Sequence, residues 1–241
     1  MSRGIFVTGT GTDIGKTYIT GLILKKLREA GLSAAYFKAA VSGNERSADG
    51  ALIPGDPLHV KTVSGIEQPL EEMCPYVYEN AVSPHLAARI EGSPVEPDVI
   101  KSRFADLCSR YDFVTMEGSG GIICPIRWDG QKILLEDIIK SLGLDCIIVA
   151  DAGLGTINSV VLTCEYMKSR GIAVKGIIFN NWQGGVMEED NRSMCQQLTG
   201  VPVIACVERG AADLDISADE LTKLYGGVLH DMVSLRSDED P

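Results

Sequence analysis

The chain alternates short, wholly apolar runs with longer segments in which apolar residues recur at helical spacing. The apolar runs predict β-strands over residues 4–8, 34–38, 112–117, 145–150, 174–180 and 202–206. The helical spacing predicts α-helices over residues 16–31, 57–64, 83–91, 95–110, 157–170 and 186–199. Strands that are apolar throughout are typical of a sheet covered on both faces. We therefore expect an α/β fold with a mainly parallel sheet of about seven strands and helices on both faces.

Length and composition favour a single domain over residues 1–241. Of the 241 residues, 45% are hydrophobic and 23% charged, and no low-complexity or Pro/Ser-rich linker divides the chain. Residues 39–57 are rich in Gly, Ser, Asn, Asp and Pro, which predicts a long loop of the kind that carries function. The acidic end of the chain, from about residue 235, is expected to be disordered.

Charge and cysteine content exclude some classes of protein. A formal net charge of −11 and a pI near 4.8 argue against non-specific nucleic-acid binding, which needs Lys and Arg to neutralise phosphates. The seven cysteines form no Cys-x-x-Cys pair, so we expect reduced, buried thiols. The N-terminus enters a strand at once, and no apolar run approaches the roughly 18 residues that span a bilayer. These observations predict a cytoplasmic protein without a membrane partner.

A glycine-rich segment, Gly9–Thr17, follows the apolar run at residues 5–7 and opens the first predicted helix. Glycine-rich backbone between a strand and Gly-Lys-Thr is typical of a phosphate-binding P-loop. Its N–H groups turn inward, the helix N-terminus attracts anions, and Lys16 reaches the outer phosphates. The standard spacing needs glycine at position 10, where this chain has Thr10, so the loop is one residue longer. The motif predicts a P-loop NTPase-like fold.

Polar side chains follow several of the predicted strands where they end. In a parallel sheet these ends meet at one edge, where ligands bind, and the candidates are Lys38, Glu117, Asp151 and Asn180. Glu117 precedes a glycine turn, an arrangement suited to Mg²⁺ chemistry. Plainer interpretations stay open, because Lys38 can be a solvated charge and Asp56 an ordinary turn residue. For Asp151 we favour a turn-capping function.

Several segments together resemble the dethiobiotin synthetase family. The extended loop is joined, in the family's order, by Phe37–Gly43, Ser83-Pro84-His85, Glu117–Gly121 and Gly153–Asn158. The resemblance covers residues 5 to about 206, and the set is far more specific than any one of its members. It implies an ATP- and Mg²⁺-dependent ring closure in which 7,8-diaminononanoate and CO₂ become dethiobiotin, a step of biotin synthesis. The implied intermediates are a carbamate and a carbamic-phosphoric anhydride, and the implied assembly is a homodimer whose substrate site is completed by the neighbouring subunit.

The resemblance also assigns functions to individual residues. It implies catalytic functions for Lys16 and Lys38, and Mg²⁺ ligation by Thr17, Asp56 and Glu117. The nucleotide-binding residues that it implies are Asp13, Ile14, Gly15, Lys16, Thr17, Tyr18, Asp56, Glu117, Gly118, Ser119, Gly120, Asn180 and Asn181. The substrate-binding residues that it implies are Thr12 and Ser42 and, toward the partner subunit, Gly155, Thr156, Ile157 and Asn158. Asn180 matches the family's adenine-contacting asparagine, and the Asn-Lys-x-Asp that selects guanine is absent.

Three departures and two rival functions accompany this interpretation. The chain has Gly11 where the family commonly has Asp, and Val207–Gly210 where the family has Ile-Pro-x-Leu near the base. The stretch Gln183-Gly184-Gly185 gives no specific match. An amidoligase of the cobyrinate type would need a glutaminase domain, for which 241 residues leave no room. A MinD/ParA-like regulatory or partner-positioning ATPase generally carries a second lysine early in the loop, where this chain has Thr10 and Gly11.

Overall fold

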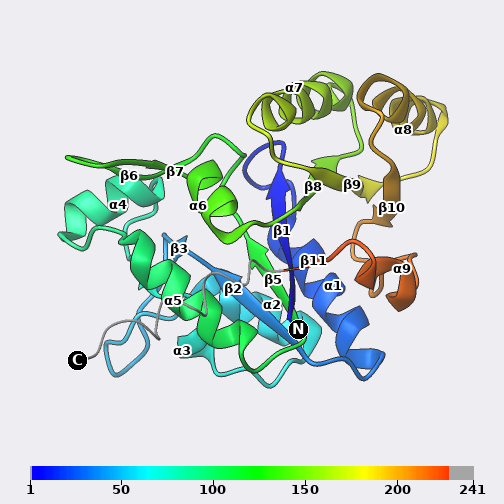
Figure 1. Cartoon of the computed structure of the whole chain (residues 1–241). Helices are drawn as coiled ribbons and strands as arrows, with labels where there is room; N and C mark the ends of the chain where they lie inside the picture. Colours follow the sequence, from blue (N-terminus) through cyan, green and yellow to red (C-terminus); the bar gives the residue numbers. More distant parts are fainter. Residues whose placement is uncertain (1, 228–241) are drawn as a thin grey trace, which may run out of the picture.

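A seven-stranded sheet crosses the molecule in the computed structural model, which describes residues 2–227 (Figure 1). Its parallel strands, in spatial order, are β10 (Val203–Glu208), β9 (Val174–Trp182), β8 (Cys146–Asp151), β1 (Arg3–Gly9), β5 (Phe113–Glu117) and β2 (Ala34–Lys38). The seventh strand, β11 (Gly226–Gly227), pairs antiparallel with the start of β1. The predicted, mainly parallel sheet is confirmed. The expected disorder from about residue 235 lies outside the described residues.

Helices cover both faces of this sheet because its strands are apolar on both sides. Alternate residues of β1 enter different cores: Ile5 and Val7 belong to one, and Phe6 to the other. The helices on the first face are α1 (Lys16–Glu29), α2 (Gly55–Ser64), α3 (Leu70–Met73) and α9 (Ala218–Thr222). Those on the second face are α4 (Pro84–Glu91), α5 (Pro97–Cys108), α6 (Leu135–Leu142), α7 (Thr156–Ser169) and α8 (Val186–Thr199).

Several short elements differ from the sequence-based expectation. The predicted loop over 39–57 contains β3 (Ala40–Val41), which pairs with β4 (Tyr76–Val77). An antiparallel hairpin, β6 (Pro125–Trp128) and β7 (Lys132–Leu134), leads directly into α6. Helix α6 was not predicted, because no Ser, Thr or Gly separates it from β7. Its first turn is stabilised instead by the Asp137 carboxylate, which accepts a hydrogen bond from the Leu134 N–H at 2.8 Å.

The cysteines have the predicted character. All seven are free thiols, and five are buried: Cys74, Cys124, Cys146, Cys164 and Cys195. Burial raises the pKa of the Cys74 thiol to about 12, so the group is a neutral apolar filler at physiological pH. Among residues 2–227, no helix has the length and apolarity needed to cross a membrane.

Candidate active site

The glycine-rich loop between β1 and α1 is held in place by a side chain from β9. Asn180, at the end of that strand, donates a hydrogen bond to the carbonyl oxygen of Ile14 at 2.9 Å. Gly15 has a φ of 92°, and a Cβ there would lie 2.1 Å from Asn180 Nδ2. Only glycine combines this left-handed backbone with the absence of a side chain. Asn180 therefore fixes the backbone that begins α1.

Lys16 lies buried in the first turn of α1 and folds back onto the loop. Its Nζ donates a hydrogen bond to the Gly11 carbonyl oxygen at 2.7 Å. Burial lowers the pKa of the Lys16 ammonium, and the nearby charge of Lys38 lowers it further. An anion entering beside these two cations would relieve that repulsion. The loop thus has the features of an anion site before any ligand is present.

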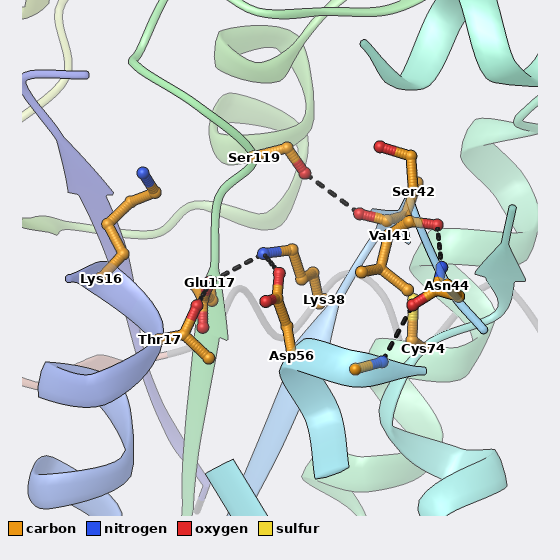
Figure 2. Close-up of polar contacts among 12 residues, drawn as sticks. Lys16, Thr17, Lys38, Val41, Ser42, Asn44, Asp56, Cys74, Glu117 and Ser119 are labelled. Carbon is orange, nitrogen blue, oxygen red and sulfur yellow. Dashed lines mark hydrogen bonds and ion pairs between the residues drawn. The ribbon is translucent and has the colours of Figure 1, made fainter. Parts of the chain in front are cut away.

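Four side chains from four separate elements, α1, β2, α2 and β5, converge beside this loop (Figure 2). We call Thr17, Lys38, Asp56 and Glu117 the Lys38 cluster. The Lys38 Nζ lies 2.6 Å from Asp56 Oδ2 and 2.7 Å from Glu117 Oε1, and the Thr17 hydroxyl donates to the same Glu117 oxygen at 2.9 Å. Lys38 and Glu117 are paired in register at the carboxyl ends of β2 and β5. Parallel pairing therefore brings together residues that are 79 positions apart.

The Lys38 cluster is strongly polarised and mostly shielded from solvent. Lys38 is 4% exposed and Glu117 is 1% exposed. Burial alone would lower the pKa of the Lys38 ammonium, but the carboxylates of Glu117 and Asp56 outweigh it and hold that pKa above its usual value. For Asp56, burial opposes ionisation and Lys38 favours it, and the net effect lowers the pKa of the carboxyl group. Lys38 and Asp56 are therefore both charged at neutral pH.

The structure decides between the interpretations that the sequence left open. Lys38 is not a solvated charge, because it is buried between two carboxylates. Asp56 belongs to the first turn of α2, but its carboxylate points to Lys38 rather than capping the turn. The favoured interpretation of Asp151 is confirmed, because its Oδ1 accepts a hydrogen bond from Gly153 N at 2.8 Å. Its other oxygen accepts one from Asn181 Nδ2 at 2.8 Å.

The donor set of the Lys38 cluster fits a small divalent cation such as Mg²⁺. Two carboxylates and one hydroxyl lie together and supply oxygen ligands. The positively charged Lys38 ammonium is already bonded to both carboxylates, and the Thr17 hydroxyl is bonded to one of them. Within residues 2–227 there is no group of three or more His, Cys, Asp or Glu that could hold a metal by itself.

A cleft of about 1100 Å³ opens beside the loop and the Lys38 cluster. It collects most of the candidate residues: Thr12, Asp13, Gly15, Lys16, Thr17, Tyr18, Lys38, Ser42, Asp56, Glu117, Ser119 and Gly120. Its other walls include Val82, Pro84 and Ile123, which make part of it apolar. A second cavity, of about 560 Å³, is lined by Asp13, Asn181, Gln183 and Arg209. Asp13 therefore borders both cavities, and Asn181 lines the second one.

Some candidate residues lie outside the large cleft. Ile14 and Asn180 support the loop from behind, and they are not among the described residues that line the cleft. Gly118 is also outside, and a Cβ there would come within 2.9 Å of Phe6 and Leu135. Residues 155–158 form the N-cap and first turn of α7 and do not line this chain's own cleft.

The segment that follows β10 begins with Arg209 and is bonded to α1. The Tyr18 hydroxyl donates a hydrogen bond to the Ala211 carbonyl oxygen, and Lys25 Nζ donates to the Ala212 carbonyl oxygen at 2.7 Å. Lys26 pairs with Asp213. Tyr18 thus joins the helix that follows the glycine-rich loop to the segment that follows Arg209, a residue of the second cavity.

Sequence reasoning missed two residues that build the Lys38 cluster. Asn44 is buried, and its Nδ2 donates to the carbonyl oxygens of Val41 and Tyr78 at 3.1 and 2.7 Å. Its Oδ1 accepts the Gly55 N–H at 2.9 Å, which fixes the start of α2 and so places Asp56 (Figure 2). Tyr36 donates a hydrogen bond to Glu117 Oε2 at 3.1 Å. An isolated Asn in a polar loop and a Tyr in an apolar strand carry no signal for either contact.

A glycine-rich loop between a central parallel strand and a helix, with a lysine and a hydroxyl in the first helical turn, defines a P-loop nucleotide-binding protein. A ParA family ATPase from Chlorobium tepidum shares this fold, with a TM-score of 0.54, 13% identity and coverage of 93% of this chain and 89% of that one. A chain of the MinC:MinD cell division protein complex of Aquifex aeolicus is similar, with a TM-score of 0.54, 13% identity and coverage of 86% of this chain and 81% of that one. At this identity the likeness shows the fold alone.

Sequence relatives are more specific. A family model described as an AAA domain matches residues 3–212. The ATP-dependent dethiobiotin synthetase BioD of Brachyspira hyodysenteriae is 48% identical over 217 residues, which cover 89% of this chain and 96% of that protein. The ATP-dependent dethiobiotin synthetase BioD of Clostridium botulinum is 44% identical over 226 residues, covering 93% and 99%. The chain belongs to the dethiobiotin synthetase family.

Proposed function

We propose that this chain is an ATP- and Mg²⁺-dependent cyclo-ligase that forms dethiobiotin from 7,8-diaminononanoate and CO₂ in biotin synthesis. The observation that carries the proposal is the Lys38 cluster, which opens into the same cleft as the glycine-rich loop. Relatives that are 44–48% identical over nearly their whole length support the same activity. By contrast, the MinD/ParA-like alternative has only the shared fold in its favour.

In the proposed reaction, one amine of the substrate adds to CO₂ and loses a proton to give a carbamate. A carbamate oxygen then attacks the γ-phosphorus of ATP, and ADP leaves. Finally, the second amine attacks the carbonyl carbon of this carbamic-phosphoric anhydride and expels phosphate, which closes the cyclic urea. The sum is one diamine, one CO₂ and one ATP converted to dethiobiotin, ADP and phosphate.

The main physical difficulty in this reaction is to bring two anions together. Carbamate and γ-phosphate both carry negative charge, and preorganised positive groups are the usual remedy in phosphoryl transfer. Lys16 and Lys38 line one cleft, so both are placed to neutralise charge that develops between the two reactants. We assign them as the catalytic residues.

The remaining contacts follow from the walls of the cleft. When bound through Thr17, Asp56 and Glu117, Mg²⁺ would neutralise the nucleotide phosphates. Thr12 and Ser42 line the cleft and are assigned to binding of the diamine. In the structure without substrate, the Ser42 hydroxyl donates to the Val82 carbonyl oxygen at 2.6 Å. The loop from Asp13 to Tyr18, the turn from Glu117 to Gly120, and Asn180 with Asn181 are assigned to the nucleotide.

We further propose that the enzyme is a cytoplasmic homodimer. Residues 155–158 open α7 away from this chain's own cleft, with Gly155 at a φ of 91° and the neighbouring Leu154 93% exposed. The Thr156 hydroxyl is buried without a hydrogen-bond partner. The positive end of a helix dipole is suited to a carboxylate, here that of a substrate bound in the second subunit.

The proposal is tested by incubating the purified chain with 7,8-diaminononanoate, bicarbonate, Mg²⁺ and ATP and detecting dethiobiotin by mass spectrometry. Reactions that omit the diamine or bicarbonate, and the variant Lys38→Met, serve as controls and should give no product. Absence of product from the wild type, together with ATP hydrolysis that does not respond to the diamine, would show that the proposed function is wrong.

The metal assignment has its own test in Glu117→Gln. Replacing one carboxylate oxygen by an amide nitrogen removes a hard ligand and its charge, so the Mg²⁺ concentration for half-maximal rate should rise at least tenfold. An unchanged Mg²⁺ titration would exclude Glu117 as a ligand.

A further inference from the structure

Glu117 uses its two carboxylate oxygens for different partners. Oε1 contacts Lys38 at 2.7 Å and Thr17 at 2.9 Å, on the side of the cleft. Oε2 contacts the Tyr36 hydroxyl at 3.1 Å, on the side of the protein interior. Because a carboxylate can rotate about its last side-chain bond, a separate donor on each oxygen holds the group in one orientation.

Tyr36 is itself fixed by a second buried residue, Gln68. The Gln68 Oε1 accepts the Tyr36 N–H at 2.8 Å, and its Nε2 donates to the Tyr36 carbonyl oxygen at 3.0 Å. β2 is the last strand of the sheet on this side, so the amide of Gln68 takes the place of a further strand. Gln68 is 2% exposed and Tyr36 is fully buried, which leaves the ring no alternative position.

We propose that Tyr36, clamped by Gln68, is a positioning residue that orients Glu117 so that Oε1 is presented to the metal and to Lys38. This proposal rests on the proposed function only in taking Glu117 as a Mg²⁺ ligand. Residues that hold a metal ligand in place typically change metal affinity by roughly ten- to a hundredfold when removed. The expected consequence of losing the hydroxyl is therefore weaker metal binding, with nucleotide binding left intact.

The test uses the full chain, with Mn²⁺ as a paramagnetic probe for the Mg²⁺ site and ADP as the nucleotide. Tyr36→Phe keeps the ring and removes only the hydroxyl. Its matched control is Tyr225→Phe, because Tyr225 is also buried and its hydroxyl shares a hydrogen bond of 2.6 Å with Thr115, two residues before Glu117 on β5. Electron paramagnetic resonance gives the Mn²⁺ affinity with ADP bound, and calorimetry gives the ADP affinity without metal.

Tyr36→Phe is expected to weaken Mn²⁺ binding by about tenfold while the metal-free ADP affinity stays within about twofold, and Tyr225→Phe should change neither. Unchanged Mn²⁺ affinity in Tyr36→Phe, or an equal loss in Tyr225→Phe, overturns the proposal. These measurements do not require turnover, so a wild type that makes no dethiobiotin would refute the proposed function and still leave this proposal to be decided by Mn²⁺ affinity.

A second comparison keeps the test decisive if Tyr36→Phe does not fold. In the Glu117→Gln background the hydroxyl has no carboxylate to orient, so adding Tyr36→Phe should leave the Mn²⁺ affinity of Glu117→Gln unchanged. A folding defect of Tyr36→Phe that comes from the unpartnered Glu117 oxygen should likewise be relieved in the double variant, as measured by thermal unfolding. A further loss of affinity, or a persisting defect, would mean that Tyr36 does not act through Glu117.

Discussion

Removing the Lys38 ammonium leaves a buried carboxylate without its counter-charge. In Lys38→Met a side chain of similar length keeps the space filled, while the Glu117 side chain, 0% exposed, retains its charge. Losing one partner of a buried ion pair destabilises a protein by about 3–5 kcal/mol. The hydroxyls of Thr17 and Tyr36 still donate to Glu117, so we expect a destabilisation at the lower end of this range. The Asp56 side chain is 40% exposed, so the loss of its ion pair with Lys38 adds at most about 1 kcal/mol to the destabilisation.

We therefore expect Lys38→Met to lower the free energy of unfolding by about 3 kcal/mol at pH 8. The assay is urea unfolding followed by circular dichroism in a buffer that contains a chelator, so that no divalent cation replaces the lysine.

The matched control is the double variant Lys38→Met/Glu117→Gln, which replaces the ion pair by neutral groups of similar shape. It should recover stability to within about 1 kcal/mol of the wild type, because no buried charge is left unpaired. The comparison requires that the unfolding free energy depends on urea concentration with a similar slope in all three proteins. If the single and double variants are equally stable, the buried ion pair is not what Lys38 contributes, and the reasoning fails.

Three further predictions test other parts of the site. Lys16→Ala should reduce turnover at least about a hundredfold with a melting temperature close to that of the wild type, because within residues 2–227 the hydrogen bond of Nζ is to a single carbonyl oxygen, that of Gly11; near-normal turnover would contradict its assignment. Gly15→Ala should cost clearly more unfolding free energy than Gly31→Ala. Both positions have positive φ, but only at Gly15 would a Cβ clash, so equal losses would show that the clash is relieved at no cost. Asp56→Asn should be less stable than the wild type at neutral pH, and this difference should disappear as acid protonates Asp56 below its usual pKa. A difference that persists in acid would rule out its charge as the cause.

The strands and the loop were predictable from sequence because their signals are local. Runs such as Cys146–Val149 are apolar throughout, and burial on both faces of the sheet is the physical cause. The loop is recognised by its spacing to Gly15-Lys16-Thr17, and the structure places it between β1 and α1. Lys38 and Glu117 could be named as strand-end residues, since the carboxyl ends of parallel strands share one edge.

Contacts between residues that are distant in the chain could not be predicted from the sequence. Asn44 fixes the start of α2 through hydrogen bonds to backbone groups at residues 41, 55 and 78. Nothing in the sequence around Asn44 distinguishes it from a solvated loop residue, because its partners are set by the path of the loop. Helix α6 was missed for a related reason. Leu134 at its N-cap has no side-chain acceptor for the first-turn N–H groups, and the local hydrogen bond runs instead from the Leu134 N–H to the Asp137 carboxylate.

The register of β2 against β5 decides whether the Lys38 cluster forms at all. A slip of one residue would turn the Lys38 side chain to the opposite face of the sheet. Both strands are buried on both faces, so their apolar residues would be equally well covered after such a slip and cannot select the register. Polar contacts can select it: Gln68 binds both backbone groups of Tyr36, and the Tyr36 hydroxyl reaches Glu117 only in the observed pairing. The buried hydrogen bonds that build the site therefore also specify the strand register, because a slipped sheet would leave Gln68, Tyr36 and Glu117 without partners in the interior.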